Sequence, residues 1–431
     1  MLRRNGRFRQ AIYPATAPEA NDTAATTENK WRAWVEEESY KRCVCRDITT
    51  TGTDISRLAI HMLIRDAQTS LSLLTPPLIS YAEFSVTMPA PRILWDAKTS
   101  QEWKNLFLTT YTQPSISLPS LRTFMNDVCS ISDFQTLIDV QVSTLSILSG
   151  LWSLSWQYRE WKSVLQFPAS TQSRNSALIT NSFYQEILHI LGHFEVAMSD
   201  LPGDMQPIIS ILYQQQLMNL HVSLEEVQLL AGKAGEKEAR RVLPLLITWA
   251  QSQESRQAVW HAGQILRVVK ESSATGLEGS SAVAVYHASL VFWAYSIVSK
   301  SSLASESAPR QDQSTLSDPS RQGMKPEHLQ AAESKVDLCG TKGSASQRFI
   351  ALGKGQPAIQ KSTLLPTSEN ARQDESLVLL SNTNAVMKEI IQLLRRKNDI
   401  ESRVEDCSPL VENLARLMKT LGNAANGIHF R

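Results

Sequence analysis

The chain has 431 residues, of which 42% are hydrophobic and 20% charged. This length allows roughly two or three domains with sizeable cores. The 43 basic and 42 acidic side chains leave a formal net charge of +1, which gives no overall field to hold DNA or an anionic membrane. Recognition through bulk charge is therefore excluded.

The cysteines give no sign of a disulfide framework or a zinc site. They are Cys43, Cys45, Cys129, Cys339 and Cys407. Their odd number and wide scatter are unlike a small secreted domain and favour a reducing compartment. No Cys-x2-Cys pair is followed by paired His or Cys, so the ligand spacing of a structural zinc site is missing.

The first 30 residues are predicted to be a flexible, basic N-terminus. Four arginines (Arg3, Arg4, Arg7 and Arg9) precede the first acidic residue, Glu19. This pattern is open to interpretation as a mitochondrial transit peptide or a nuclear-import patch. The apolar run of a secretory signal is absent, and export is not expected.

Residues 31–300 are predicted to form a helical domain, since apolar residues recur there at helical spacing and strand-like alternation is scarce. Ser223 and Glu226 form a capping box that starts a helix. A second amphipathic helix is predicted over Arg256–Lys270. Its apolar stripe consists of Val259, Ala262, Ile265, Leu266 and Val269, with Arg256, Gln257 and Gln264 off the stripe.

Two uncharged stretches, Val140–Tyr158 and Gly279–Ser299, approach the roughly 20 residues that span a membrane. Their content of Ser, Gln and His is high for a lipid-facing helix. We therefore interpret both as buried helices and expect no membrane association.

All ten tryptophans and nine tyrosines precede residue 296, and Phe349 is the single aromatic residue of 300–375. A segment without large apolar groups cannot offset the entropy of ordering its backbone, so 301–375 is predicted to be a disordered Ser-rich linker.

Residues 376–431 are predicted to form a helical pair. One helix contains Val386 to Leu394, and the next begins at Ser408-Pro409 and stops at Gly422. The pair either folds back on the main domain or binds a partner.

The sequence contains no recognisable catalytic residue, and the chain is not expected to be an enzyme. No Gly-x-Ser-x-Gly elbow is present. The glycine pairs at 232–235 and 353–355 lack the spacing of a phosphate-binding loop and are interpreted as turns or linker residues. Glu36, Glu37 and Glu38 precede Lys41 and Arg42 on what is interpreted as a solvated helix face.

Some histidines and tryptophans are spaced as in a functional site, but ordinary packing explains their positions better. His189 and His193 stand one helical turn apart, as in a metal site, yet no third ligand is evident. We assign no metal, cofactor or DNA-binding residue. Packing is also the preferred role for a further set of residues: His221, His261, His287, Trp152, Trp156 and Trp161.

Several stretches taken together resemble the fungal-specific transcription factor regulatory domain, in the version that follows two-Cys two-His zinc fingers. The stretches are Trp31–Trp34 with Glu38–Arg42, Asp66–Leu71 with Thr75–Ser80, Leu94–Ala97 with Glu102-Trp103, His221–Glu226, Ala258–Leu266 and Tyr286–Leu290. They cover roughly residues 31 to 300. Each is a packing or helix-boundary signature, so the resemblance carries over no catalytic, metal-binding or DNA-contacting residue.

The resemblance implies an all-α regulatory domain in a nuclear transcription factor for RNA polymerase II genes. Its partners would be the transcription machinery or co-regulators. Family members bind zinc and DNA through N-terminal fingers, which this chain does not contain; DNA binding would then come from absent fingers or a partner. The expectation is a truncated chain, a misassigned start or a paralogue that has lost DNA binding.

Residues 44–60 depart from the family pattern, which runs almost directly from the Lys41-Arg42 pair into the helix that ends at Asp66-Ala-Gln68. This insert contains a turn-like run of Thr and Gly that forms helix poorly. We interpret it as a translated intron or an exposed loop. The alternative function for the whole chain is a helical scaffold or adaptor with no direct DNA role.

Overall fold

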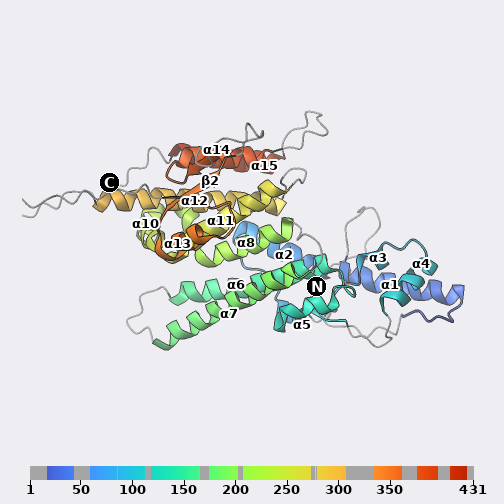
Figure 1. Ribbon diagram of the computed structural model, residues 1–431. Coiled ribbons are helices and arrows are strands. Elements are labelled where there is room, and N and C mark those ends of the chain that lie inside the picture. Colours follow the sequence, from blue (N-terminus) through green and yellow to red (C-terminus); the bar gives the residue numbers. More distant parts are fainter. Residues whose placement is uncertain are drawn as a thin grey trace, which may run out of the picture. The chain divides into compact units, whose positions relative to one another are not determined.

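The computed structural model divides the chain into two compact units, Met1–Ile209 and Ser210–Arg431. Figure 1 shows that helices make up most of both units. The described residues are 17–42, 59–84, 86–111, 118–165, 174–201, 207–272, 277, 279–306, 334–361, 376–396 and 408–424. The all-α prediction is confirmed, with a small three-stranded sheet in addition.

The first unit consists of helices around two long members, α6 and α7. Its elements are α1 (Ala24–Arg42), α2 (Ala59–Leu73), η3 (Tyr81–Glu83), α3 (Arg92–Trp95), α4 (Ser100–Thr110), α5 (Leu121–Asn126), η4 (Val128–Phe134), α6 (Val140–Leu165) and α7 (Arg174–Ser199). The Tyr158 ring of α6 lies 6.0 Å from Phe183 and 5.6 Å from Tyr184 of α7. Aromatic packing thus joins α6 to α7 at these residues, and Figure 1 shows the two helices side by side.

A tryptophan cluster joins α1, α3 and α4. The ring centroid of Trp34 lies 5.6 Å from that of Trp103 and 6.5 Å from that of Trp95. Trp103 is completely buried. Three of the stretches that carry the family resemblance therefore meet in one core.

The interpretation of Glu36–Glu38 as a solvated helix face is wrong for Glu38. Its side chain is buried, and Oε1 accepts a hydrogen bond of 2.7 Å from the main-chain nitrogen of Ala90. A buried carboxylate is tolerated when donors satisfy it. Glu38 thus links the end of α1 to the strand-like segment before α3, while Glu36 stays exposed.

The stretches around Asp66 and Ile79 are also joined by a polar contact. Asp66 Oδ2 accepts a 2.8 Å hydrogen bond from the Ile79 main-chain nitrogen. Trp152 of α6 donates from Nε1 to Ser70 Oγ of α2 at 2.8 Å. Trp152 and Trp156 are core residues as predicted, whereas Trp161 is 49% exposed.

The second unit surrounds the buried helix α12. It contains α8 (Pro207–His221), which crosses the unit boundary, α9 (Leu224–Leu230), α10 (Glu236–Gln251), α11 (Gln253–Glu271), α12 (Gly279–Glu306), β1 (Lys335–Asp337), α13 (Ser344–Leu352), β2 (Gln356–Gln360), β3 (Leu377–Leu379), α14 (Thr383–Leu394) and α15 (Pro409–Ala424). The predicted helix starts at Ser223 and around Arg256 correspond to α9 and α11. Gly232 and Gly235 lie in the turn before α10, both with positive φ.

The C-terminal pair α14 and α15 folds back on α12, which settles the alternative left open by the sequence (Figure 1). Trp293 Nε1 of α12 donates to the carbonyl oxygen of Leu421 at 3.1 Å. Ser296 and Thr383 share a buried hydrogen bond of 2.7 Å. The sequence predicts that α15 stops at Gly422, but the helix continues to Ala424. Gly422 instead lies against α14, where a Cβ at its position would be 3.3 Å from Met387 Cβ.

One helix of the described residues, α12 over Gly279–Lys300, is long and apolar enough to cross a membrane. Within the protein, however, 78% of its most apolar window is buried. Such burial is typical of a core helix, in agreement with the interpretation of this stretch.

The predicted linker is wrong for residues 334–361, which form β1, α13 and β2. β1 pairs in parallel with β2, and β2 pairs antiparallel with β3. Four apolar side chains are almost completely buried: Val336, Leu338, Phe349 and Ile359. A few well-spaced anchors therefore order a segment whose average composition predicts disorder. Residues 307–333 and 362–375 lie outside the described residues.

The other predicted boundaries shift as well. Helix α1 already begins at Ala24, inside the 1–30 region predicted to be flexible, and α12 extends beyond residue 300 to Glu306. The predicted domain 31–300 spans parts of both units. The insert 44–60 lies outside the described residues except for its last two positions, which begin α2.

Substitution of Trp103 by alanine tests the tryptophan cluster. Loss of this buried ring should reduce the free energy of unfolding by about 3–5 kcal/mol. Trp161→Ala, at a half-exposed position of α6, is the matched control and should cost about 1 kcal/mol or less. Urea unfolding followed by circular dichroism measures both; equal losses would contradict the cluster.

Candidate functional site: the surface of helix α11

Helix α11 carries several polar contacts that join separate parts of the second unit. One face contributes Val259, Ala262, Ile265 and Leu266 to the core, as the predicted stripe requires. Residues on its flanks reach two neighbours, helix α8 and the segment 334–361. We call residues 334–361 the docked segment.

Gly263 allows the main chain of the docked segment to lie directly on α11. A Cβ at this position would stand 2.3 Å from the carbonyl oxygen of Leu338 and 2.6 Å from Leu338 Cβ. Such distances are shorter than van der Waals contact. Only glycine fits here, which gives a physical reason for the glycine in the Ala258–Leu266 stretch.

Gln264 completes this contact from the next position. Its Nε2 donates to the carbonyl oxygens of Leu338 at 2.9 Å and Gly340 at 3.0 Å. The sequence places Gln264 off the apolar stripe, where solvent exposure is expected, yet only 8% of it is exposed. The docked segment covers it.

Arg256 binds the carboxyl ends of two helices at once. Its guanidinium donates to Ile350 and Ala351 of α13 at 2.9 and 3.3 Å. It also donates to Ser252, at the end of α10, at 2.9 Å. The free carbonyls at a helix C-terminus carry partial negative charge, so a cation there is favourable.

Lys270 makes the third polar contact with the docked segment, at the far end of α11. Its Nζ donates to the carbonyl oxygen of Gln360 at 2.6 Å. Arg256, Gln264 and Lys270 thus all bind main-chain carbonyls and not side chains. These polar contacts add to the burial of apolar side chains of the segment, such as Leu338 and Phe349.

His221 and His261 meet where α11 contacts α8. The rings of His221 and His261 stack with centroids 5.8 Å apart and planes 9° apart. His261 Nδ1 lies 2.8 Å from Gln214 Oε1, so a proton on Nδ1 is donated to that oxygen. Burial, and then the nearby His221 and Lys342, hold the pKa of His261 well below its ordinary value.

The remaining candidates do not join this surface. His287 Nδ1 lies 3.3 Å from Gln215 Nε2 between α12 and α8. His189 and His193 lie side by side on the exposed face of α7, with ring centroids 4.0 Å apart. Over the residues that the structure describes, no three His, Cys, Asp or Glu side chains group to hold a metal ion.

Two glycines and a cysteine of the docked segment have packing roles. Gly353 ends α13 with φ 71°, a left-handed conformation that glycine adopts without strain. A Cβ on Gly355 would meet Val336 at 2.6 Å. Burial raises the pKa of the Cys339 thiol, which keeps it protonated and unreactive.

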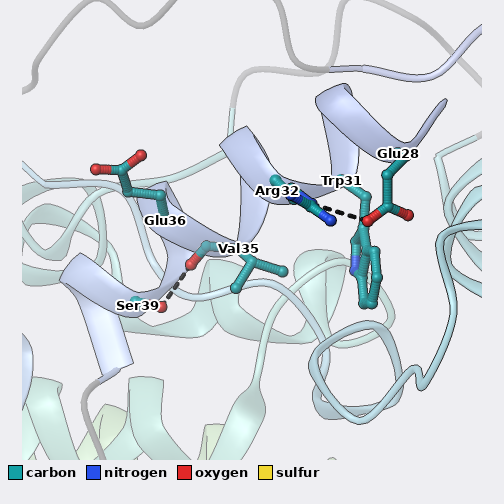
Figure 2. A pocket seen from close by; sticks show the side chains of 6 residues that line it. All are labelled: Glu28, Trp31, Arg32, Val35, Glu36 and Ser39. Atoms are coloured by element: carbon teal, nitrogen blue, oxygen red, sulfur yellow. Dashed lines mark hydrogen bonds and ion pairs between the residues drawn. The ribbon is translucent and has the colours of Figure 1, made fainter. Parts of the chain in front are cut away.

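The first unit offers a different feature, an open hollow of about 500 Å³ along α1. Figure 2 shows its lining side chains, with Arg32 turned toward Glu28. They are Glu28, Trp31, Arg32, Val35, Glu36 and Ser39. Arg32 Nε and Glu28 Oε1 are 2.8 Å apart. Because α1 alone supplies these residues, the hollow is an exposed helix face and not an enclosed site.

Comparison with known proteins relates the chain to two fungal proteins that are named as transcription factors. One, from Zymoseptoria tritici, is 24% identical over 392 residues, which are 84% of this chain and 36% of that protein. The other, Transcription factor 1 of Elsinoe fawcettii, is 22% identical over 321 residues, 70% of this chain and 31% of its own length. The chain spans about a third of these curated relatives.

No protein-family model matches the chain, and no solved structure matches it significantly. Membership of the regulatory-domain family therefore stays a prediction. The geometry nevertheless explains the Ala258–Leu266 stretch, because Gly263 and Gln264 in it hold the docked segment.

Alanine substitution should have opposite effects at two helical glycines. Gly→Ala inside a helix normally stabilises by about 0.5–1 kcal/mol, and we expect that gain at Gly192, where a Cβ meets nothing within 4 Å. Gly263→Ala should destabilise by about 1–3 kcal/mol, because the new methyl group collides with Leu338. Thermal and urea unfolding test the signs; stabilisation at both positions would contradict the close approach.

The lowered pKa of His261 predicts a loss of stability in acid. The unfolded chain binds a proton near pH 6.5 while the folded one resists it, so the free energy of unfolding falls as pH drops through that range. His261→Asn keeps a donor for Gln214 but cannot titrate. Between about pH 7.5 and about pH 5.5, the variant should lose less stability in urea unfolding than the natural chain; identical losses would refute this role.

Proposed function

We propose that this chain is the regulatory portion of a fungal transcription factor and modulates transcription of RNA polymerase II genes in the nucleus. The observation that carries the proposal is the similarity of 84% and 70% of the chain to two proteins named as fungal transcription factors. The helical architecture agrees with the regulatory domain that the sequence resembles.

In this proposal the chain acts through binding and not through catalysis. Its regulatory contacts are with co-regulators or the transcription machinery, or with a small effector among the helices. DNA contact is assigned to zinc fingers outside the matched region or to a partner protein.

A reporter assay tests this function. The full chain is fused to a DNA-binding domain of known sequence preference and expressed with a reporter gene carrying that sequence. We expect reporter output to rise or fall clearly relative to the DNA-binding domain alone. Since regulation requires recruitment, a reporter that lacks the binding sequence should not respond.

The alternative, a helical scaffold with no direct DNA role, predicts a different result. A fusion that is expressed, reaches the nucleus and leaves the reporter unchanged would contradict the regulatory proposal and favour the scaffold. A tagged natural chain that stays entirely in the cytosol would count in the same direction.

A further inference from the structure

Helix α8 carries two amide side chains into the interior of the second unit. Gln215 and Asn219 are each only 1% exposed, and they stand four positions apart, so they share one face of the helix. A buried amide costs free energy unless its nitrogen and its oxygen both find hydrogen-bond partners. Because bulk water does not reach these atoms, their partners must lie inside the protein.

The nitrogen atoms of both amides have such partners. Asn219 Nδ2 donates to the main-chain carbonyl oxygen of Gln215 at 2.8 Å. Gln215 Nε2 lies 3.3 Å from His287 Nδ1 of α12 and donates to it when the imidazole carries its proton on Nε2. The amide nitrogens therefore need no further ligand.

The two amide oxygens differ from the nitrogens. Gln215 Oε1 and Asn219 Oδ1 are buried, and among the described residues neither has a hydrogen-bond donor. A half-turn of the Asn219 amide would not help, because it would set Oδ1 against the carbonyl oxygen of Gln215. One turn of α8 thus presents two buried acceptors that call for a donor.

The chemistry of the pair limits what this donor can be. A ligand that satisfies both oxygens must offer two hydrogen atoms, as a single water molecule does. Buried waters typically make about three hydrogen bonds to polar groups that the protein leaves unsatisfied. A Mg²⁺ or Ca²⁺ ion would need about six or more oxygen ligands, whereas this face of α8 supplies two.

We propose that α8 holds an ordered water molecule, which donates one hydrogen bond to Gln215 Oε1 and one to Asn219 Oδ1. Since Gln215 also contacts His287, this water extends the polar contact between α8 and α12. The site is part of the folded core of the second unit. This inference does not depend on the transcriptional role.

Asn219→Leu tests the water through the sign of its effect on stability. Leucine is close to asparagine in shape, and the Gln215 carbonyl oxygen keeps its helical hydrogen bond. If water satisfies Oδ1, the substitution removes its site, and the unfolding equilibrium constant should rise about tenfold. If Oδ1 has no partner, removal of an unsatisfied buried group should lower that constant, which would overturn the proposal.

Asn413→Leu is the matched control, because it makes the same change at an exposed position of α15 in the same unit. Leucine favours helix more than asparagine does, so this variant should unfold with an unchanged or smaller equilibrium constant. Urea unfolding followed by circular dichroism measures both variants. Equal effects at the two positions would also contradict the proposal.

A crystal structure of the natural chain, at a resolution that shows ordered waters, gives the direct test and keeps it open if Asn219→Leu does not fold. We expect one water within about 2.6–3.2 Å of both amide oxygens. Two results would refute the site. One is the absence of a water at these oxygens, and the other is a turned Gln215 amide whose Nε2 donates directly to Asn219 Oδ1.

Discussion

The close approach of Leu338 to Gly263 sets the architecture of the second unit. It places a main-chain carbonyl directly against α11 and brings Gln264 within reach of two carbonyl oxygens. Arg256 and Lys270 can then bind the same segment at either end of the helix. Any side chain larger than hydrogen at position 263 lifts the segment and weakens all of these contacts together.

Helix α11 therefore makes two kinds of contact. Its apolar stripe packs into the helical core around α12, while its polar flank holds a unit that enters the chain some 60 residues later. In the first unit, the tryptophan cluster and Glu38 similarly join distant stretches of sequence. The stretches that resemble a regulatory domain thus mark places where separate elements meet.

The sequence predicts the helices well and the long-range contacts poorly. Periodicity locates α11, α14 and α15, and the cap at Ser223 locates α9. Composition misjudges residues 334–361, because Leu338, Phe349 and Ile359 are few among many polar residues. The glycine at the end of α13 and the nearby Pro357-Ala-Ile359 run are the local signals of order. Periodicity cannot reveal that Gln264 is covered, since its burial depends on a segment more than 70 residues away.

Hydrogen exchange of main-chain amides in the full chain tests the central claim most directly. The amides of Leu338, Gly353 and Gln356 donate within the docked segment, and each should exchange about a hundredfold more slowly than in the free peptide of residues 334–361. Docking against α11 provides that protection. Exchange at the rate of the free peptide would show that the segment is a disordered linker and would contradict the account.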